Sequence, residues 1–399
     1  MTSPVLRQVV AGDWTSLNDL HRWAWFPQRS ERGWQWLHSF GQGYPGWVLE
    51  DEQGVCGYLG NIRQNYTLAN ARFQAATGYS LIVLPRAKGG SKALLDAFRS
   101  QPGVFATSIF NGNDRSAAIY EREGFSPFPE AWANAKIVWP LAPMTILSER
   151  VARLQFRDRR PPRELFCAST RPSVPSRMEP LVALDPWLEA DSIELFHEEL
   201  CRSQTVVADR SAAALQRRFS DPDQTVAPVL FGWKESGRLS AIALGQTGKL
   251  TERDAPILDV IDIAWIGPDG RSAAVTLLSH LKTLGRRSGA SRMRLSLVNN
   301  ATAAVAGSVP GRLVRRRHVH AYAHYSDAHS PTELWRPTPY DGDFAFCLRA
   351  PPVAAVDELP GIRFPPVVAA IGDGCLDRRS ADFDDLRLCA LRGDGQRVG

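Results

Sequence analysis

Residues 78–125 read GYSLIVLPRAKGGSKALLDAFRSQPGVFATSIFNGNDRSAAIYEREGF, and this stretch decides the fold. It begins with an apolar run at 79–84, which a proline closes, and a loop with two adjacent glycines follows. A helical pattern at 92–98, a second apolar run at 104–110 and a short helical segment at 113–120 come next. The order predicts a strand, a loop, a helix, a second strand and a second helix.

The loop between the first strand and the first helix has the chemistry of an anion-binding site. Gly89 and Gly90 carry no side chain, so backbone N–H groups can come close to an anion. The helix that begins near Ser91 adds unpaired N–H donors and the positive end of its dipole. The cations Arg86, Lys88 and Lys92 flank the glycines. The loop therefore predicts a cradle for a pyrophosphate, although an ordinary tight connection can also contain such glycines.

Two motifs in this stretch resemble those of the GCN5-related N-acetyltransferase (GNAT) superfamily. Arg86-x-x-Gly89-x-Ser91 is similar to the family's pyrophosphate loop, Gln/Arg-x-x-Gly-x-Gly/Ala, with serine in the last position. Residues 113–125 contain N-x-x-S-x-x-x-Y-x-x-x-G-F, which resembles the family's closing motif. The two motifs occur in the family's order and at about its separation, and that combination is more specific than either motif alone.

The resemblance implies a role for each of these positions. Val83 and Leu84 would lie on the strand whose backbone pairs with the pantetheine arm of CoA. Tyr120 would protonate the leaving CoA thiolate, a reasonable step because a phenol, with a pKa of about 10, and a thiolate have similar basicity. A core tyrosine with a bonded hydroxyl is the alternative for this residue. The remaining cofactor contacts would come from Arg86, Lys88, Gly89, Gly90, Ser91, Lys92, Asn113 and Ser116.

Composition and charge are those of an ordinary globular protein. The 399 residues are 44% hydrophobic and 22% charged, and this length predicts two or three domains. No apolar run reaches 18 residues and the first residues contain no apolar signal region, so we expect no membrane span and a cytoplasmic protein. The net charge of +5 suits an anionic cofactor and does not call for nucleic acid. The six cysteines form no C-x-x-C pair, and Asp341 and Asp343 have no further ligands nearby, so we expect no disulfide and no metal.

The order of predicted elements divides the chain into four parts. Residues 1–145 agree with a GNAT domain, in which a final strand at 135–139 completes the sheet. Residues 146–180 contain one helical pattern and are then rich in proline and arginine, as in a linker. Residues 181–350 repeat the order of the first part and look like a second GNAT-like domain, as in tandem GNAT proteins. Residues 351–399 are punctuated by prolines and predict an extended tail. The predicted fold class is therefore α/β with mixed sheets.

The second unit lacks the features of a pyrophosphate cradle. Its strand-to-helix turn at 267–271 contains Pro268, which has no N–H donor, and Asp269, which repels phosphate. No Tyr-x-x-x-Gly-Phe follows its next strand. We interpret this unit as a degenerate partner of the first. Its basic cluster at 315–320 predicts either a solvated face or a contact with an anionic acceptor.

The expected activity is acyl-CoA-dependent N-acyltransfer, with acetyl-CoA or another acyl-CoA as co-substrate. The resemblance implies direct attack on the thioester by the amine of a small-molecule acceptor. Glu50, Asp51 and His21 are candidates for the base by region only. Dense tryptophans at 23, 25, 34 and 36 predict core packing singly and an apolar or ring-shaped acceptor as a group.

Several alternatives remain open at this point. Amino sugars, amino acids, polyamines and long-chain bases are all compatible acceptors, and an acyl carrier protein could replace CoA as the donor. A non-catalytic acyl-CoA-binding module is a second class of function, which binding without transfer would indicate. An aminoacyltransferase that uses charged tRNA is a third, which strongly salt-dependent tRNA binding would indicate.

Overall fold

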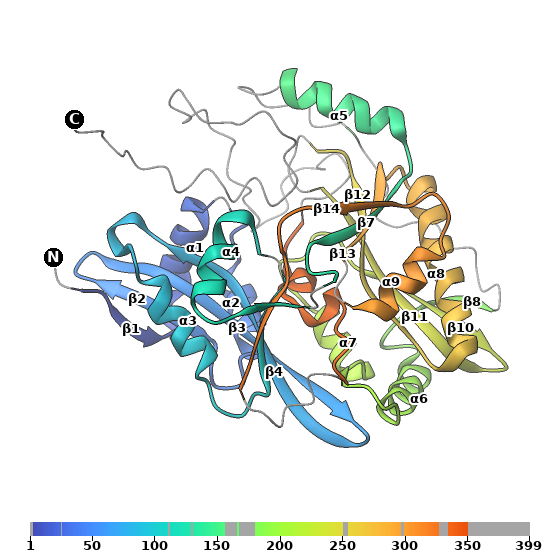
Figure 1. Cartoon of the computed structure of the whole chain (residues 1–399), viewed down its shortest axis with the longest axis horizontal. Coiled ribbons are helices and arrows are strands. Elements are labelled where there is room, and N and C mark those ends of the chain that lie inside the picture. The colour runs from blue at the N-terminus through green and yellow to red at the C-terminus, as the bar shows by residue number, and fades with distance from the viewer. Residues whose placement is uncertain are drawn as a thin grey trace.

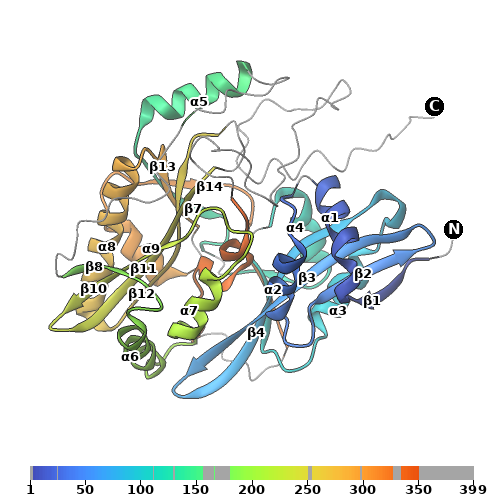
Figure 2. The same cartoon turned by 180° about the vertical axis from the view of Figure 1, so that it is seen from behind.

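The computed structural model describes residues 3–24, 26–110, 112–128, 131–155, 166, 180–249, 254–296, 299–326 and 334–349. We call residues 3–155 the first half of the chain and residues 180–349 the second half. Each half builds most of one mixed β-sheet with helices packed against it (Figures 1 and 2). The predicted α/β class and the succession of two α/β units are confirmed.

The first half follows the order that the sequence predicts. Its elements are β1 (Val5–Gln8), η1 (Ala11–Asp13), α1 (Trp14–Trp23), α2 (Glu31–Ser39), β2 (Gly46–Asp51), β3 (Gly54–Leu68), β4 (Ala71–Val83), η2 (Pro85–Ala87), α3 (Ser91–Arg99), β5 (Ala106–Ile109), α4 (Asp114–Arg122), β6 (Ser126–Pro127), β7 (Ala135–Pro140) and α5 (Pro143–Gln155). The helix predicted at 147–154 is confirmed as part of α5. The rest of the expected linker, apart from residues 166 and 180, and the expected tail lie outside the described residues.

The second half repeats much of this order. They are β8 (Leu181–Leu184), α6 (Ala190–Cys201), β9 (Val207–Ala208), α7 (Ala212–Phe219), β10 (Val229–Glu235), β11 (Arg238–Gly248), β12 (Ile257–Trp265), α8 (Gly267–Arg287), β13 (Arg292–Ser296), α9 (Asn300–Gly307), β14 (Leu313–Arg316), β15 (Tyr322–Tyr325), η4 (Pro339–Asp341) and η5 (Asp343–Phe346). Among the described residues, no helix has the length and apolar character to cross a membrane.

Alternating residues along a strand of the first sheet pack into two separate hydrophobic cores. Trp47 and Leu49 of β2 pack with α3, whereas Val48 between them packs with α1 and α2. Successive strand side chains point to opposite faces, so α3 covers one face of the sheet and α1 and α2 cover the other. Burying one large apolar side chain contributes about 1.5–3 kcal/mol, which makes these helix contacts the main stabilising force of the half.

The two halves exchange strands, and the first sheet also includes the short β9 of the second half, which pairs with β3. The first sheet has the order β1-β2-β3-β4-β5-β15-β6, and the second has the order β14-β7-β13-β12-β11-β10-β8. Strand β15 of the second half pairs with β5, and β7 of the first half pairs with β13 and β14. The prediction that residues 135–139 complete the first sheet is therefore wrong. The pattern at these residues predicts a buried strand correctly, but it contains no information about which sheet receives that strand.

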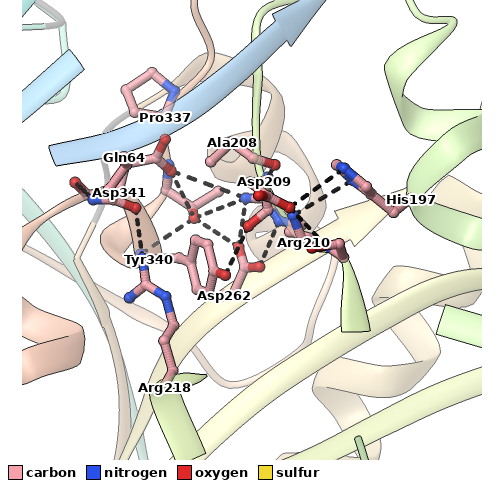
Figure 3. A network of polar contacts seen from close by, with 12 residues as sticks. Gln64, His197, Ala208, Asp209, Arg210, Arg218, Asp262, Pro337, Tyr340 and Asp341 are labelled. Carbon is pink, nitrogen blue, oxygen red and sulfur yellow. Dashed lines mark hydrogen bonds and ion pairs between the residues drawn. The ribbon is translucent and has the colours of Figure 1, made fainter. Parts of the chain in front are cut away.

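A buried polar network joins the halves near the second sheet (Figure 3). The Arg210 guanidinium donates to both carboxylate oxygens of Asp262 at 2.7 and 2.9 Å. Thr338 donates to the same carboxylate at 2.6 Å, and Gln64 of β3 donates to the carbonyl oxygen of Asp341. Breaking one member of such a buried set costs several kcal/mol, because the partner charge stays buried. The halves therefore behave as one folded unit.

Candidate functional site

An unpaired strand edge opens in the first sheet. Strands β4 and β5 run parallel, and their last residue pair joins Thr77 to Ser108. Within the described parts of the chain, residues 78–83 of β4 continue beyond that pair without a paired strand on this side, while β3 pairs with their other edge. Backbone N–H and C=O groups on an unpaired edge can hydrogen-bond an extended ligand as if it were a further strand.

A β-bulge lies on this open part of β4. Ser80 and Leu81 together oppose the single residue Leu59 of β3, and Ser80 has φ of +55°. A bulge leaves one residue out of the ladder and bends the strand. Backbone strain at a non-glycine residue is often located at functional sites, so Ser80 belongs to the candidate site. Ser80 was not among the predicted site residues. The one sequence feature that could have indicated it is a polar residue within an apolar run.

The glycine loop continues directly from the open edge. Helix η2 follows β4, and Gly89, with φ of +93°, turns the chain into α3. The N–H groups of Gly89 and Ser91 donate to no acceptor in the described part of the chain. A Cβ atom on Gly89 would meet nothing within 4 Å, whereas one on Gly90 would clash with Leu49. The loop thus packs closely on the sheet and leaves space and donors on its outer side, which fits a pyrophosphate.

The three cations of the loop differ in their partners. Arg86 Nε donates to Asp51 Oδ2 at 2.8 Å, and this contact lowers the pKa of the Asp51 carboxyl. Lys92 Nζ donates to Asp96 at 2.7 Å, which raises the pKa of its ammonium. Lys88 is exposed, and its side chain forms no hydrogen bond or ion pair with any residue in the described ranges. Arg86 therefore anchors the loop to the β2–β3 turn, and Lys88 is the cation best placed for a phosphate.

Asn113 and Ser116 form the start of α4. The Asn113 side-chain oxygen accepts the Ser116 N–H at 3.0 Å, and the Ser116 hydroxyl oxygen accepts the Asn113 N–H at 3.0 Å. This reciprocal cap satisfies two donors that a helix start would otherwise leave unpaired. Both residues thus fix the end of α4 that follows β5.

Tyr120 lies further along the same helix, α4. Its side chain is 5% exposed, and its ring lies 5.4 Å from that of Tyr322 and 6.1 Å from that of Phe125. Because Tyr322 belongs to β15, the strand exchange brings a residue of the second half against Tyr120. The sequence prediction did not find this contact, since it assigned β15 to the other sheet's unit.

The residues named as base candidates are each engaged in a structural contact. Glu50 accepts from Arg7 at 2.6 Å, Asp51 accepts from Arg86, and the fully buried His21 lies 3.0 Å from the Pro27 carbonyl oxygen. The tryptophans also serve packing: Trp34 is 1% exposed and Trp36 donates to a backbone carbonyl of α7, while Trp25 lies outside the described residues. Among the described residues, no cluster of His, Cys, Asp and Glu side chains could hold a metal ion.

In the second sheet, other segments of the chain occupy the position that corresponds to the open edge of β4. Strands β12 and β13 also separate, after the pair of Asp259 and Arg294. Asp259 accepts from Arg294 at 2.8 Å and from Arg349 at 3.4 Å, and η4 packs against β12. Burial opposes ionisation of Asp259, but the two guanidinium groups outweigh it and lower its pKa. Helix α8 begins at Gly267, one residue after β12 ends, and has Pro268 in its first turn, so this connection is shorter than the glycine loop of the first half.

A cavity of about 1340 Å³ lies elsewhere, between the β3–β4 turn and α6. Tyr66, Phe73 and His197 contribute to its walls. The cavity is roughly 30 Å along β4 from the glycine loop, given the rise of a strand. The volume of this cavity does not by itself link the cavity to the open edge of β4.

Comparison with solved structures identifies the fold. A conserved protein of unknown function from Enterococcus faecalis V583, named as a probable N-acyltransferase, matches with a TM-score of 0.51 and 11% identity, over 84% of this chain and 75% of that chain. Saccharomyces cerevisiae N-myristoyltransferase with bound myristoyl-CoA and inhibitors matches with a TM-score of 0.50 and 11% identity, over 83% and 82%. A GCN5-related N-acetyltransferase from Anabaena variabilis ATCC 29413 gives 0.48 and 14%, over 83% and 75%.

The comparisons establish the fold of this chain but not its activity. The chain has the GNAT fold, as its two motifs predict, and the two neighbours with the higher TM-scores above are named as a probable N-acyltransferase and an N-myristoyltransferase. At identities this low, the similarity establishes no activity for this chain. No family model matches the sequence, and no curated protein matches it.

Proposed function

We propose that this chain is an acyl-CoA-dependent N-acyltransferase that acylates the amine of a small-molecule acceptor by direct attack. The cofactor site consists of the open edge of β4, the loop from Arg86 to Lys92, and the capped start of α4. Acetyl-CoA is the simplest donor for this site. The second half supplies β15 and a supporting wall, and it binds no cofactor of its own.

One observation carries this proposal. The first sheet combines an unpaired parallel-strand edge with a glycine loop in which the N–H groups of Gly89 and Ser91 have no acceptor in the described residues. An extended pantetheine arm and a pyrophosphate need these two features side by side, in this order along the chain. Only one of the two sheets in the described structure offers both, because η4 and Arg349 fill the matching place in the other.

Each residue of the proposed site would have a separate role in acyl transfer. Acyl-CoA supplies the thioester whose acyl carbon receives the amine nitrogen. Val83 and Leu84 would hold the pantetheine arm through their backbone, and Gly89, Gly90, Ser91 and Lys88 would hold the pyrophosphate. As the new C–N bond forms and the C–S bond breaks, Tyr120 would deliver a proton to the departing sulfur. The amine gives up one proton to solvent, so Tyr120 can be reprotonated.

A matched pair of variants tests the cofactor site. Gly89→Asp places a carboxylate where phosphate oxygens would lie, and Gly89→Asn has almost the same shape without the charge. Both residues accept a positive φ better than most side chains do. We expect calorimetry to show that Gly89→Asp loses CoA affinity by roughly 10-fold or more relative to Gly89→Asn, while both melt at similar temperatures. Equal CoA affinity in the two variants would place the pyrophosphate elsewhere.

A further inference from the structure

Helix α5 turns its large apolar side chains away from the protein. Met144, Leu147, Val151 and Leu154 are between 53% and 79% exposed, and we call these four residues the apolar stripe. Their spacing of three and four residues places them along one face of the helix. A helix on the surface of a globular protein normally buries such a face and exposes its polar one. Packing within the described chain therefore does not explain the apolar stripe.

The opposite face of α5 is held by ion pairs. The buried carboxylate of Glu149 accepts from Arg292 of β13 at 2.7 Å, and Arg153 lies 2.9 Å from Asp254, which precedes β12. These contacts determine which face of the helix points outward. Figures 1 and 2 both show α5 at the periphery of the molecule, beyond the second sheet. The apolar stripe is thus presented on a fixed helix at the outer surface.

Exposed cations lie close to the apolar stripe. Arg150 precedes Val151 on α5, and Arg286 and Arg287 end α8. The end of α8 lies beside the start of α5, since a Cβ atom on Gly285 would be 2.8 Å from Leu141. None of these three arginines forms an ion pair with a residue in the described ranges. Cations next to exposed apolar side chains are complementary to a surface that is both apolar and anionic.

We propose that α5 binds the surface of a lipid bilayer that contains anionic lipids, with the apolar stripe among the headgroups and the arginines beside them. This inference is independent of the proposed acyl transfer. A second copy of the chain fits the stripe less well. Arg150 lies near the middle of the stripe, so a symmetric pair would bring the two copies of Arg150 together. Four side chains also cover less than the roughly 800 Å² per partner that a stable protein interface buries.

The test is flotation of the full-length protein with two kinds of vesicle, one of phosphatidylcholine alone and one of phosphatidylcholine and phosphatidylglycerol in equal amounts. We expect binding to the anionic vesicles and much weaker binding to the neutral ones. Leu147→Glu should weaken binding to the anionic vesicles by roughly 10-fold or more, and Leu147→Phe should retain it. Arg150→Gln should weaken that binding by about 5-fold, because one cation near the charged surface is lost.

Leu195→Glu is the matched control, since Leu195 is 66% exposed on α6, which lies far from α5 in both views of the molecule. It should bind vesicles as the wild type does. Absence of binding by the wild type, an equal loss in Leu195→Glu, or equal binding to neutral and anionic vesicles would overturn the inference. A dimer that light scattering detects and that Leu147→Glu dissociates would assign the stripe to a second copy and also overturn it. So would a large loss of stability of Leu147→Glu in urea, because the chain itself would then cover the stripe.

Discussion

Tyr120 is the residue on which the proposed chemistry depends, and its position is set by both halves. Helix α4 presents it between Phe125 of the first half and Tyr322 of β15. A phenol enclosed in this way keeps a fixed orientation, which a proton donor requires, and packing alone would require only its ring. Removing the hydroxyl separates the two roles.

Tyr120→Phe should lower the turnover of acyl transfer by roughly 10²–10⁴-fold while changing CoA affinity little. The ring and its packing remain, and only the proton donor is lost. Tyr322→Phe is the control, since its hydroxyl donates to Glu121 at 3.3 Å on the surface of α4 and is given no part in the transfer. Steady-state kinetics with acetyl-CoA would measure both variants. A Tyr120→Phe enzyme as fast as the wild type would remove Tyr120 from the mechanism.

His38 makes the stability of the first half depend on pH. Burial and the charge of Arg29 together lower the pKa of His38 to about 4, although Asp13 opposes the shift. Between pH 6.5 and 4 the unfolded chain therefore binds a proton that the folded chain does not, so the stabilisation present above pH 6.5 is lost as the pH falls. The shift corresponds to about 3 kcal/mol.

His38→Gln should flatten this part of the pH profile, because glutamine cannot take up the proton. Urea unfolding of the variant and the wild type at several values between pH 7 and pH 4 would measure the difference. We expect the free energies of unfolding to converge as the pH falls. Profiles that run parallel over this range would show that His38 titrates normally in the folded protein.

Sequence reasoning reached some residues of the site and not others. Gly89 and Gly90 were predictable, because the loop needs glycine for a positive φ at one and for close packing at the other. The ion pair of Arg86 with Asp51 was not predictable, because the two residues are 35 positions apart in the sequence. The position of Arg86 in the motif predicts a phosphate contact instead. Bulged Ser80 was also missed, because a bulge depends on the pairing register and not on local composition.

At the scale of elements, the order of helices and strands was predictable and the pairing of two strands was not. Apolar periodicity predicts β7 as a strand, and its Ile137 and Trp139 are buried. The strand β15 was not predicted, although its Tyr322 and Ala323 are buried as well. Both sheets offer such a strand an equivalent place, between a parallel strand and a short edge strand. Which sheet receives each strand depends on contacts between the halves, and no local sequence pattern predicts those contacts.

The exchange predicts that residues 1–145 do not fold by themselves. Without β15, the first sheet leaves β5 and β6 without their shared neighbour, and the apolar side chains of β7 have no sheet to enter. We expect this fragment to show no cooperative unfolding transition by circular dichroism. Co-expression with residues 146–399 should restore a folded complex. A fragment that unfolds cooperatively on its own would contradict the reciprocal exchange.

On the scale of the whole molecule, the two halves share a fold and differ in what occupies the gap between their parallel strands. In the second sheet, Asp259 and Asp262 bind arginines and Thr338 from other parts of the chain. In the first sheet, residues 78–83 and the glycine loop leave their edge open. We therefore propose that the first half holds the binding site and that the second half supports it.

The number of CoA molecules bound per chain tests this account most directly. Calorimetry of the full-length protein should give one CoA per chain, and a crystal structure of that complex should place it along β4, η2 and the start of α3. The physical reason is that only this place, within the described structure, offers both an unpaired strand edge and free N–H donors at a glycine turn. Two CoA molecules per chain, or a single one bound against β12 and the start of α8, would contradict the assignment of the two halves.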